Sequence, residues 1–289
     1  MPVCARHSQW TYHGSAYGFA GEIERPFRHV IPTQAATVLG ASGGRGMDRV
    51  EKFKLEGVIS FDTAYVEVGG SFDDCHGRHT SYASSTIENL NILNVVTADR
   101  VVSRLAVYSP KADERGDFTF NITGSHFDNL RIAGHKIDVK LATSIFHEHD
   151  THSKIADAHK KGHLDEWLLG NKFKDNELPK LEEEYHALGG MSQVVKAWKQ
   201  KGDKRNTDSM TFSPINHVDV GKDLEKTELG CFGSFICVPK FGVVRLAELT
   251  ARKHCVNLVM LRVDMCSTGT GGTTGGGVGG GGSHPTGGT

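Results

Sequence analysis

Long hydrophobic runs are absent from this sequence, which excludes the helical membrane proteins. Its apolar stretches extend over only a few residues, whereas a helix needs about 20 apolar residues to cross a bilayer. The first residues also lack the charged segment and the apolar core of a secretory signal. We therefore expect a cytoplasmic protein that has no membrane partner.

An excess of charge of either sign is also absent. The 289 residues include 33 Lys and Arg against 34 Asp and Glu, so the summed field gives no reason to expect binding to nucleic acid. We therefore expect no nucleic-acid partner. A net charge near zero also leaves little repulsion between copies of the chain, which favours a homo-oligomer.

Closely paired cysteines are missing too. Six cysteines stand at positions 4, 75, 231, 237, 255 and 266, without a C-x-x-C pair or a repeated spacing. Neither a zinc ribbon nor a disulfide framework is indicated. We expect free thiols that are mostly buried.

Alternation of apolar and polar residues is frequent, in contrast, between residues 57 and 141. The segment Lys136–Leu141 (KIDVKL) places its three apolar residues on one face and its three charged residues on the other. Such a pattern is typical of antiparallel sheets that have one solvated face. It favours a sandwich or a roll.

The same strand pattern returns near the C-terminus, at 231–238, 243–249 and 256–265. We expect the first two segments to form a hairpin. We expect the last segment to be a central strand, because its odd and even positions are both apolar and both of its faces would be covered. We predict one mainly β domain over residues 1–266, an antiparallel sandwich or roll. With its helical insertion the fold class is α+β overall.

Two segments forty positions apart share a pattern. Ser85–Ile92 (STIENLNI) and Ser125–Ile132 (SHFDNLRI) both fit S-x-x-x-N-L-x-I. In each segment, the alternation of apolar and polar residues shifts by one position at an asparagine, Asn89 or Asn129. Asparagine suits a left-handed turn or a bulge at such a point. An internal duplication and a coincidence both account for the similarity.

The helical insertion is expected at about residues 147–210. Candidate helices at 153–161, 178–188 and 192–201 each end before a glycine, as helix C-caps do. Lys and Arg balance Asp and Glu in this segment, which is typical of a solvated surface. Trp167 and Trp198 are expected to hold these helices against the sheet.

The last segment, residues 267–289, is rich in glycine. Glycine loses more backbone freedom on folding than other residues, so we expect a tail that is flexible by itself. It would become ordered only against something else, such as a sheet edge of a partner subunit.

A glycine loop in Ala35–Val50 (AATVLGASGGRGMDRV) raises the possibility of dinucleotide binding. Gly40, Gly43, Gly44 and Gly46 could let the backbone approach a pyrophosphate, with Asp62 on a ribose hydroxyl. The residues after the loop, however, have too few apolar positions for a crossover helix. We interpret the loop as a turn or bulge between strands.

Histidines gather at Phe146–His152 (FHEHDTH). If His147 and His149 lie on one side of a strand and His152 starts a helix, the three could bind Zn, Ni or Fe. A solvated junction between a strand and a helix explains the cluster without a metal. The neighbouring thiol and imidazole in Asp73–Gly77 (DDCHG) are interpreted as part of a polar loop, because sequence neighbours on a strand point to opposite faces.

Three functions are compatible with these patterns. The first is a structural or interaction protein, not an enzyme, that self-associates through its β-rich domain. The second is a metal-dependent enzyme that uses His147, His149 and His152. The third is a nucleotide-binding oxidoreductase.

Overall fold

The computed structural model describes residues 10–23, 29–55, 57–111, 116–164, 167, 207–220, 229–265 and 269–282, the last range by its backbone alone. Most of the described residues lie in strands and few lie in helices. All paired strands run antiparallel. The predicted mainly β class is therefore confirmed.

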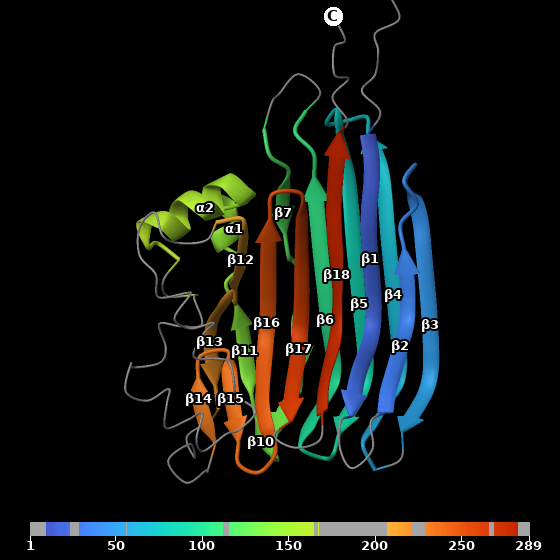
Figure 1. The fold of residues 1–289 in the computed structure, drawn as a ribbon, viewed down its shortest axis with the longest axis vertical. Helices are drawn as coiled ribbons and strands as arrows, with labels where there is room; N and C mark the ends of the chain where they lie inside the picture. The colour runs from blue at the N-terminus through green and yellow to red at the C-terminus, as the bar shows by residue number, and fades with distance from the viewer. Residues whose placement is uncertain are drawn as a thin grey trace, which may run out of the picture.

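One sheet, called here the front sheet, faces the viewer in Figure 1. Its strands are hydrogen-bonded in the order β14-β15-β16-β17-β18-β1-β2, with β12 beside β16. Their bounds are β1 Trp10–Ile23, β2 His29–Val38, β12 Ser209–Phe212, β14 Gly230–Phe232, β15 Phe235–Val238, β16 Gly242–Arg252, β17 Cys255–Met265 and β18 Gly269–Gly282.

The second sheet, called the back sheet, lies behind the first. Its order is β10-β9-β6-β5-β4-β3, and β7 and β8 also pair with β6. Their bounds are β3 Gly44–Leu55, β4 Ile59–Asp73, β5 Arg78–Ile92, β6 Val96–Tyr108, β7 Thr119–Asn121, β8 His126–Asp128, β9 Arg131–Ile132 and β10 His135–Lys136. A separate pair joins β11 (Asp138–Leu141) to β13 (Ile215–Asp219).

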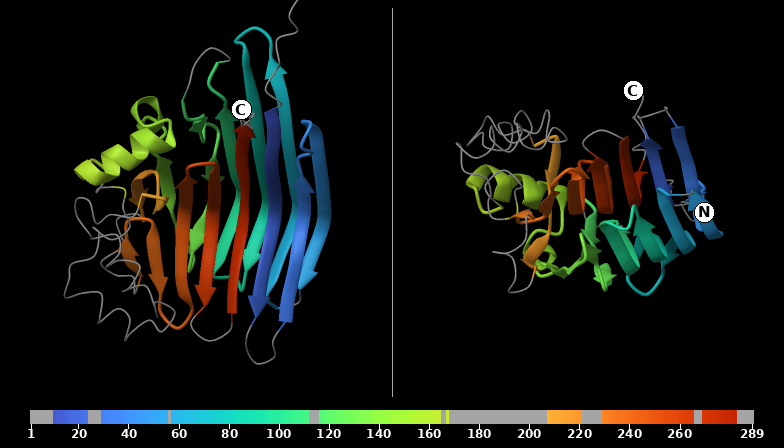
Figure 2. Two further views of the ribbon diagram at one scale, coloured as in Figure 1. Left: turned by 45° about the horizontal axis from the view of Figure 1, so that its top comes forward. Right: turned by 90° about the horizontal axis from the view of Figure 1, so that it is seen from below.

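The two sheets pack face to face, as the view from below in Figure 2 shows. Strands β1, β2, β17 and β18 of the front sheet contact strands β4, β5 and β6 of the back sheet. The buried core between them includes Val66, Ile87 and Leu105 from the back sheet and Leu246 and Leu261 from the front sheet. The fold is thus an antiparallel sandwich.

The C-terminal strands differ in one detail from the prediction. Residues 231–238 form two strands, β14 and β15, because the chain turns at Gly233, which has a positive φ of 63°. The predicted hairpin with 243–249 is confirmed for β15, which pairs antiparallel with β16. The expected central strand is β17, which lies between β16 and β18.

Two helices pack beside the front sheet, at the upper left of Figure 1. They are α1 (Ile145–Glu148) and α2 (His152–Lys161). The Thr151 side chain caps α2 by accepting a bond from the Lys154 backbone N–H, and Gly162 ends it at φ 79°. The predicted helix at 153–161 is confirmed, and Trp167 packs against the core. The segments 178–188 and 192–201, with Trp198, lie outside the described residues.

The shared asparagines adopt the predicted left-handed conformation, with φ 53° at Asn89 and 49° at Asn129. Each side chain donates to a carboxylate on the neighbouring strand. Asn89 Nδ2 lies 2.7 Å from Asp62 Oδ2, and Asn129 Nδ2 lies 3.3 Å from Asp99 Oδ1. The strand register is the same before and after each asparagine. The phase slip is therefore a left-handed residue without a bulge.

The glycine-rich segment is part of the front sheet. Strand β18 lies between β1 and β17 and pairs with both. Across the interface it contacts β5, whose buried Ser81, Ala83 and Ser85 are small. The hydrogen bonds to two neighbours offset the ordering cost of glycine. The surroundings that order the tract thus come from the same chain, and the sandwich extends past residue 266 to Gly282.

Candidate functional site

A groove lies on the outer face of the front sheet, over β17, β18, β1 and β2. It is lined by Tyr17, Ala20, Gly21, Glu22, Val30, Ile31, Pro32, Thr33, Val259, Arg262 and Asp264, and its volume is about 500 Å³. We call it the outer groove.

The groove has small residues in its middle at the level of Arg262. The register aligns Arg262 on β17 with Gly272 on β18, and Gly272 with Ala20 on β1. Gly272 has no side chain and Ala20 has only a methyl group. Larger residues stand on either side of this row, namely Tyr17 toward one end and Glu22 and Asp264 toward the other.

A charged network forms the β17 side of the groove. Arg245 on β16 and Arg262 on β17 are directly opposed, which is unfavourable for two like charges. Two carboxylates bind them. Glu248 contacts Arg245 at 2.8 Å and Arg262 at 3.3 Å, and Asp264 contacts Arg245 at 2.6 Å. The Glu248 side chain is only 8% exposed, and it orients the Arg262 guanidinium, which is 42% exposed.

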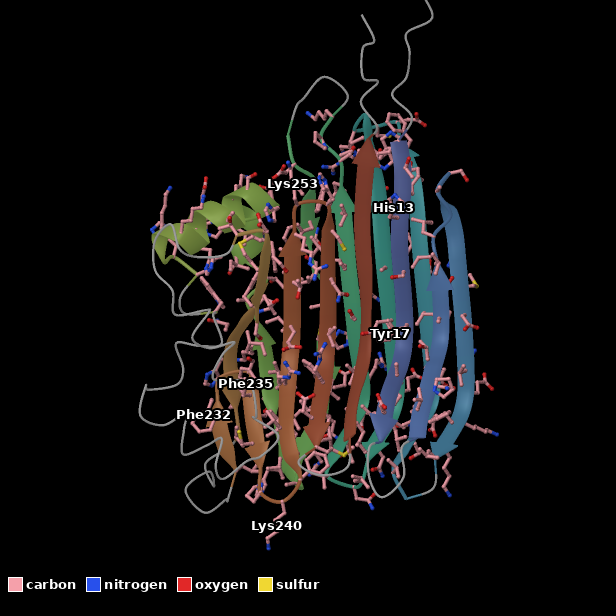
Figure 3. The ribbon with its side chains drawn as sticks, viewed as in Figure 1. His13, Tyr17, Phe232, Phe235, Lys240 and Lys253 are labelled. Atoms are coloured by element: carbon pink, nitrogen blue, oxygen red, sulfur yellow. The ribbon has the colours of Figure 1, made fainter. Side chains whose placement is uncertain are left out.

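Tyr17 links the network to the middle of the sheet. It lies on β1 in Figure 3, with His13 nearer the start of the same strand. Burial raises the pKa of Tyr17, while Arg262 lowers it and Glu248 raises it. Its phenol is therefore neutral and lies within electrostatic range of both groups. It can donate and accept a hydrogen bond.

Donors and acceptors that are held in place around an open floor are suited to binding a polar ligand. No local sequence pattern revealed this site. Arg245 and Glu248 (VVRLAEL) and Arg262 and Asp264 (LRVDM) are visible in the sequence, but they come together with Tyr17 only when β18 is inserted between β17 and β1.

A second cluster joins the two sheets. The His79 ring on β5 stacks on Trp10 with 5.0 Å between centroids, and meets Tyr12 and Phe72 edge-on. The Tyr12 hydroxyl lies 2.6 Å from His79 Nδ1. Burial lowers the pKa of His79 and raises that of Tyr12. The cluster thus holds a neutral imidazole.

The predicted histidine ligands are not brought together. His147 belongs to the short helix α1 and not to a strand, so that part of the prediction was wrong, while His152 starts α2 as expected. His149 caps α1, and His152 Nε2 bonds to the Thr207 carbonyl oxygen at 2.9 Å. Over the described part of the chain, no group of three His, Cys, Asp or Glu residues could hold a metal ion.

The glycine loop is a connection between strands, as interpreted from the sequence. It joins β2 in the front sheet to β3 in the back sheet, and the residues after it continue as a strand. Asp62 lies on β4 and bonds to Asn89. Nothing in this arrangement matches a Rossmann unit, in which a helix follows the loop.

The Asp73–Gly77 segment is the polar loop that was expected, between β4 and β5. Asp73 accepts bonds from the Cys75 backbone N–H and from the His76 ring, so His76 Nδ1 pairs with a carboxylate and not with the thiol. Of the four described cysteines, Cys237 is buried and Cys231 is partly buried, whereas Cys75 and Cys255 are exposed. The expectation of mostly buried thiols was therefore wrong for these two.

Comparison with known proteins adds a family but no activity. The family model described as "Domain of unknown function (DUF8256)" matches residues 10–252, most of the chain. Strands β17 and β18 come after the matched residues. No curated protein and no solved structure gave a match. Among the described helices, none is long and apolar enough to span a membrane.

Proposed function

We propose that the chain, which belongs to the DUF8256 family, is an interaction protein that self-associates through the β2–β3 edge of its sandwich. Within the described part of the chain, β2 pairs only with β1 and β3 only with β4. The observation that carries the proposal is the exposure of Val38 (74%) and Met47 (56%) on these two edges. Apolar side chains on open edges favour association with another chain.

The two exposed residues stand close together. A Cβ placed on Gly46 would lie 3.4 Å from the Val38 carbonyl oxygen, so β2 and β3 come together here. Val38 and Met47 can then form one contact surface. A second copy related by a two-fold axis would present the same surface, which makes the contact self-complementary.

The charges of the edge also favour a second copy as the partner. Strand β2 (HVIPTQAATV) contains no Lys, Arg, Asp or Glu, while β3 (GRGMDRVEKFKL) carries charges of both signs. Asp48 Oδ2 accepts a bond from the Ala36 backbone N–H at 2.8 Å, which protects the middle of β2 from further strand pairing. Contacts between the two copies therefore come from side chains near Val38.

The exposed thiols Cys75 and Cys255 also support the cytoplasmic location that we propose, because free thiols persist in reducing compartments. Microscopy of a tagged chain tests this location.

Sedimentation velocity of the full chain over a wide concentration range, with a reducing agent present, tests the association. We expect an oligomer that the double variant Val38→Lys, Met47→Lys weakens by about ten-fold or more, since an unpaired Lys is costly to bury.

Leu93→Lys is the matched control. Leu93 is 36% exposed but lies in the turn after β5, outside the proposed contact, so this variant should associate normally. A wild-type chain that stays monomeric at every concentration contradicts the proposal. So does a double variant that associates as well as the wild type.

A further inference from the structure

The outer groove combines groups of opposite hydrogen-bonding character within a small area. Arg262 only donates, Asp264 and Glu22 only accept, and the Tyr17 hydroxyl does both. Ala20 and Gly272 are in register with Arg262, and Thr270 lies between Glu22 and Asp264. A matching ligand must therefore present donors and acceptors close together, as the neighbouring hydroxyl groups of a sugar do.

The charges of the described residues around the groove include both signs and give an anion no clear advantage. Arg245 and Arg262 are offset by Glu248 and Asp264 through the ion pairs of the network described above, and Glu22 adds a further carboxylate to the lining. This balance gives an anion no net attraction. A neutral ligand keeps the network intact.

From these observations we infer that the outer groove is a binding site for a neutral saccharide. The hydroxyl groups bond to Arg262 and Asp264, while the aromatic ring of Tyr17 packs against the apolar face of a sugar ring. The volume of about 500 Å³ lies within the range of small-molecule sites, about 300–1,000 Å³.

The site is organised before the ligand arrives. Glu248 holds Arg262 and Arg245 holds Asp264, so binding immobilises few additional side chains. The glycine strand adds a flat floor, which lets a sugar ring approach the backbone of the sheet. This inference is independent of self-association, because Val38 and Met47 do not line the groove.

Calorimetry or saturation-transfer NMR with the full chain tests this inference. The probes are neutral oligosaccharides of glucose, mannose, galactose and N-acetylglucosamine, with a heparin-derived oligosaccharide as the anionic comparison. We expect at least one neutral probe to bind and the anionic probe not to bind.

Two variants locate the binding. Ala20→Phe fills the floor of the groove, and Thr33→Trp covers it from an exposed position on β2 that tolerates a large side chain. Each should weaken binding at least ten-fold. His13→Phe adds an aromatic ring at an exposed position of the same strand β1, outside the groove (Figure 3), and should leave binding within two-fold of the wild type.

The inference is overturned if no neutral probe binds, if only the anionic probe binds, or if Thr33→Trp and a folded Ala20→Phe both bind like the wild type. Circular dichroism shows whether each variant is folded. The Val38→Lys, Met47→Lys variant should keep its saccharide binding, so that failure of one proposal is distinguishable from failure of the other.

Discussion

His79 connects the front and back sheets through its ring. It stacks on Trp10 and meets Tyr12, both on β1, while its own backbone belongs to β5. A neutral imidazole can accept the Tyr12 hydroxyl bond at Nδ1, but an imidazolium carries protons on both nitrogens and cannot. Protonation therefore reverses this bond, so that Nδ1–H donates to the Tyr12 hydroxyl, and it places a charge in a partly buried aromatic cluster, which burial disfavours.

The lowered pKa of His79 predicts a pH dependence of stability. The unfolded chain binds this proton more readily than the folded chain, so the free energy of unfolding falls as the pH decreases below the ordinary value of 6.5. The loss levels off once the pH is below the lowered pKa.

Thermal unfolding of the wild type and of His79→Gln between pH 8 and pH 5 measures this effect. The difference in melting temperature between the two should shrink as the pH falls, which separates His79 from the other histidines of the chain. A difference that stays constant with pH would show that His79 does not contribute.

At the scale of strands, left-handed residues repeat across both sheets. Lys52 on β3 and Asn89 on β5 have φ 53° in the back sheet, and Ala35 on β2 and Ala247 on β16 have φ 50° and 49° in the front sheet. In the back sheet, the alternation of buried and exposed positions shifts by one residue beside Asn89, and it does so on β4, β5 and β6 alike. Each strand thus keeps its apolar residues in the core on both sides of the change.

Substitution at Asn89 tests how much this conformation costs. Asn89→Ala should lower the free energy of unfolding by about 1–2 kcal/mol, because alanine is strained at positive φ and the bond to Asp62 is lost. Asn89→Gly loses the same bond without the strain, so it should cost less than Asn89→Ala. Chemical denaturation measures both. Equal losses in the two variants would contradict a role for backbone strain.

At the scale of the whole molecule, β18 closes the front sheet. It joins the N-terminal hairpin of β1 and β2 to the C-terminal strands β14–β17, as Figures 1 and 2 show. Without β18 the front sheet would be divided into two parts, β14–β17 and β1–β2. Strands β17 and β1 would then each have an unpaired edge beside the core.

Truncation of the chain after Cys266 should therefore destabilise the whole sandwich and not only an interaction. We expect a melting temperature at least several degrees lower and binding of a hydrophobic dye, because β1 and β17 each lose a hydrogen-bonded neighbour. A shorter truncation after Gly282 keeps all these pairs and serves as the control. If both truncated chains melt like the full chain, β18 does not stabilise the fold.

The sequence by itself determined the elements whose cause is local. Alternating residues predicted the strands, Gly162 predicted the end of α2, and the asparagines at the phase slips predicted left-handed residues. These features depend on side-chain direction and on φ, both of which are set by a few neighbouring residues.

Only the tertiary structure decided which distant residues meet. Local patterns do not contain the strand order, and the glycine tract has no periodicity that would reveal its place between β1 and β17. The outer groove follows from that insertion, because Tyr17 and Arg262 are separated by 245 positions in the chain and lie on either side of β18. The histidines that are close in sequence fall instead on two helices and a cap. Long-range strand pairing, rather than sequence proximity, positioned the candidate site.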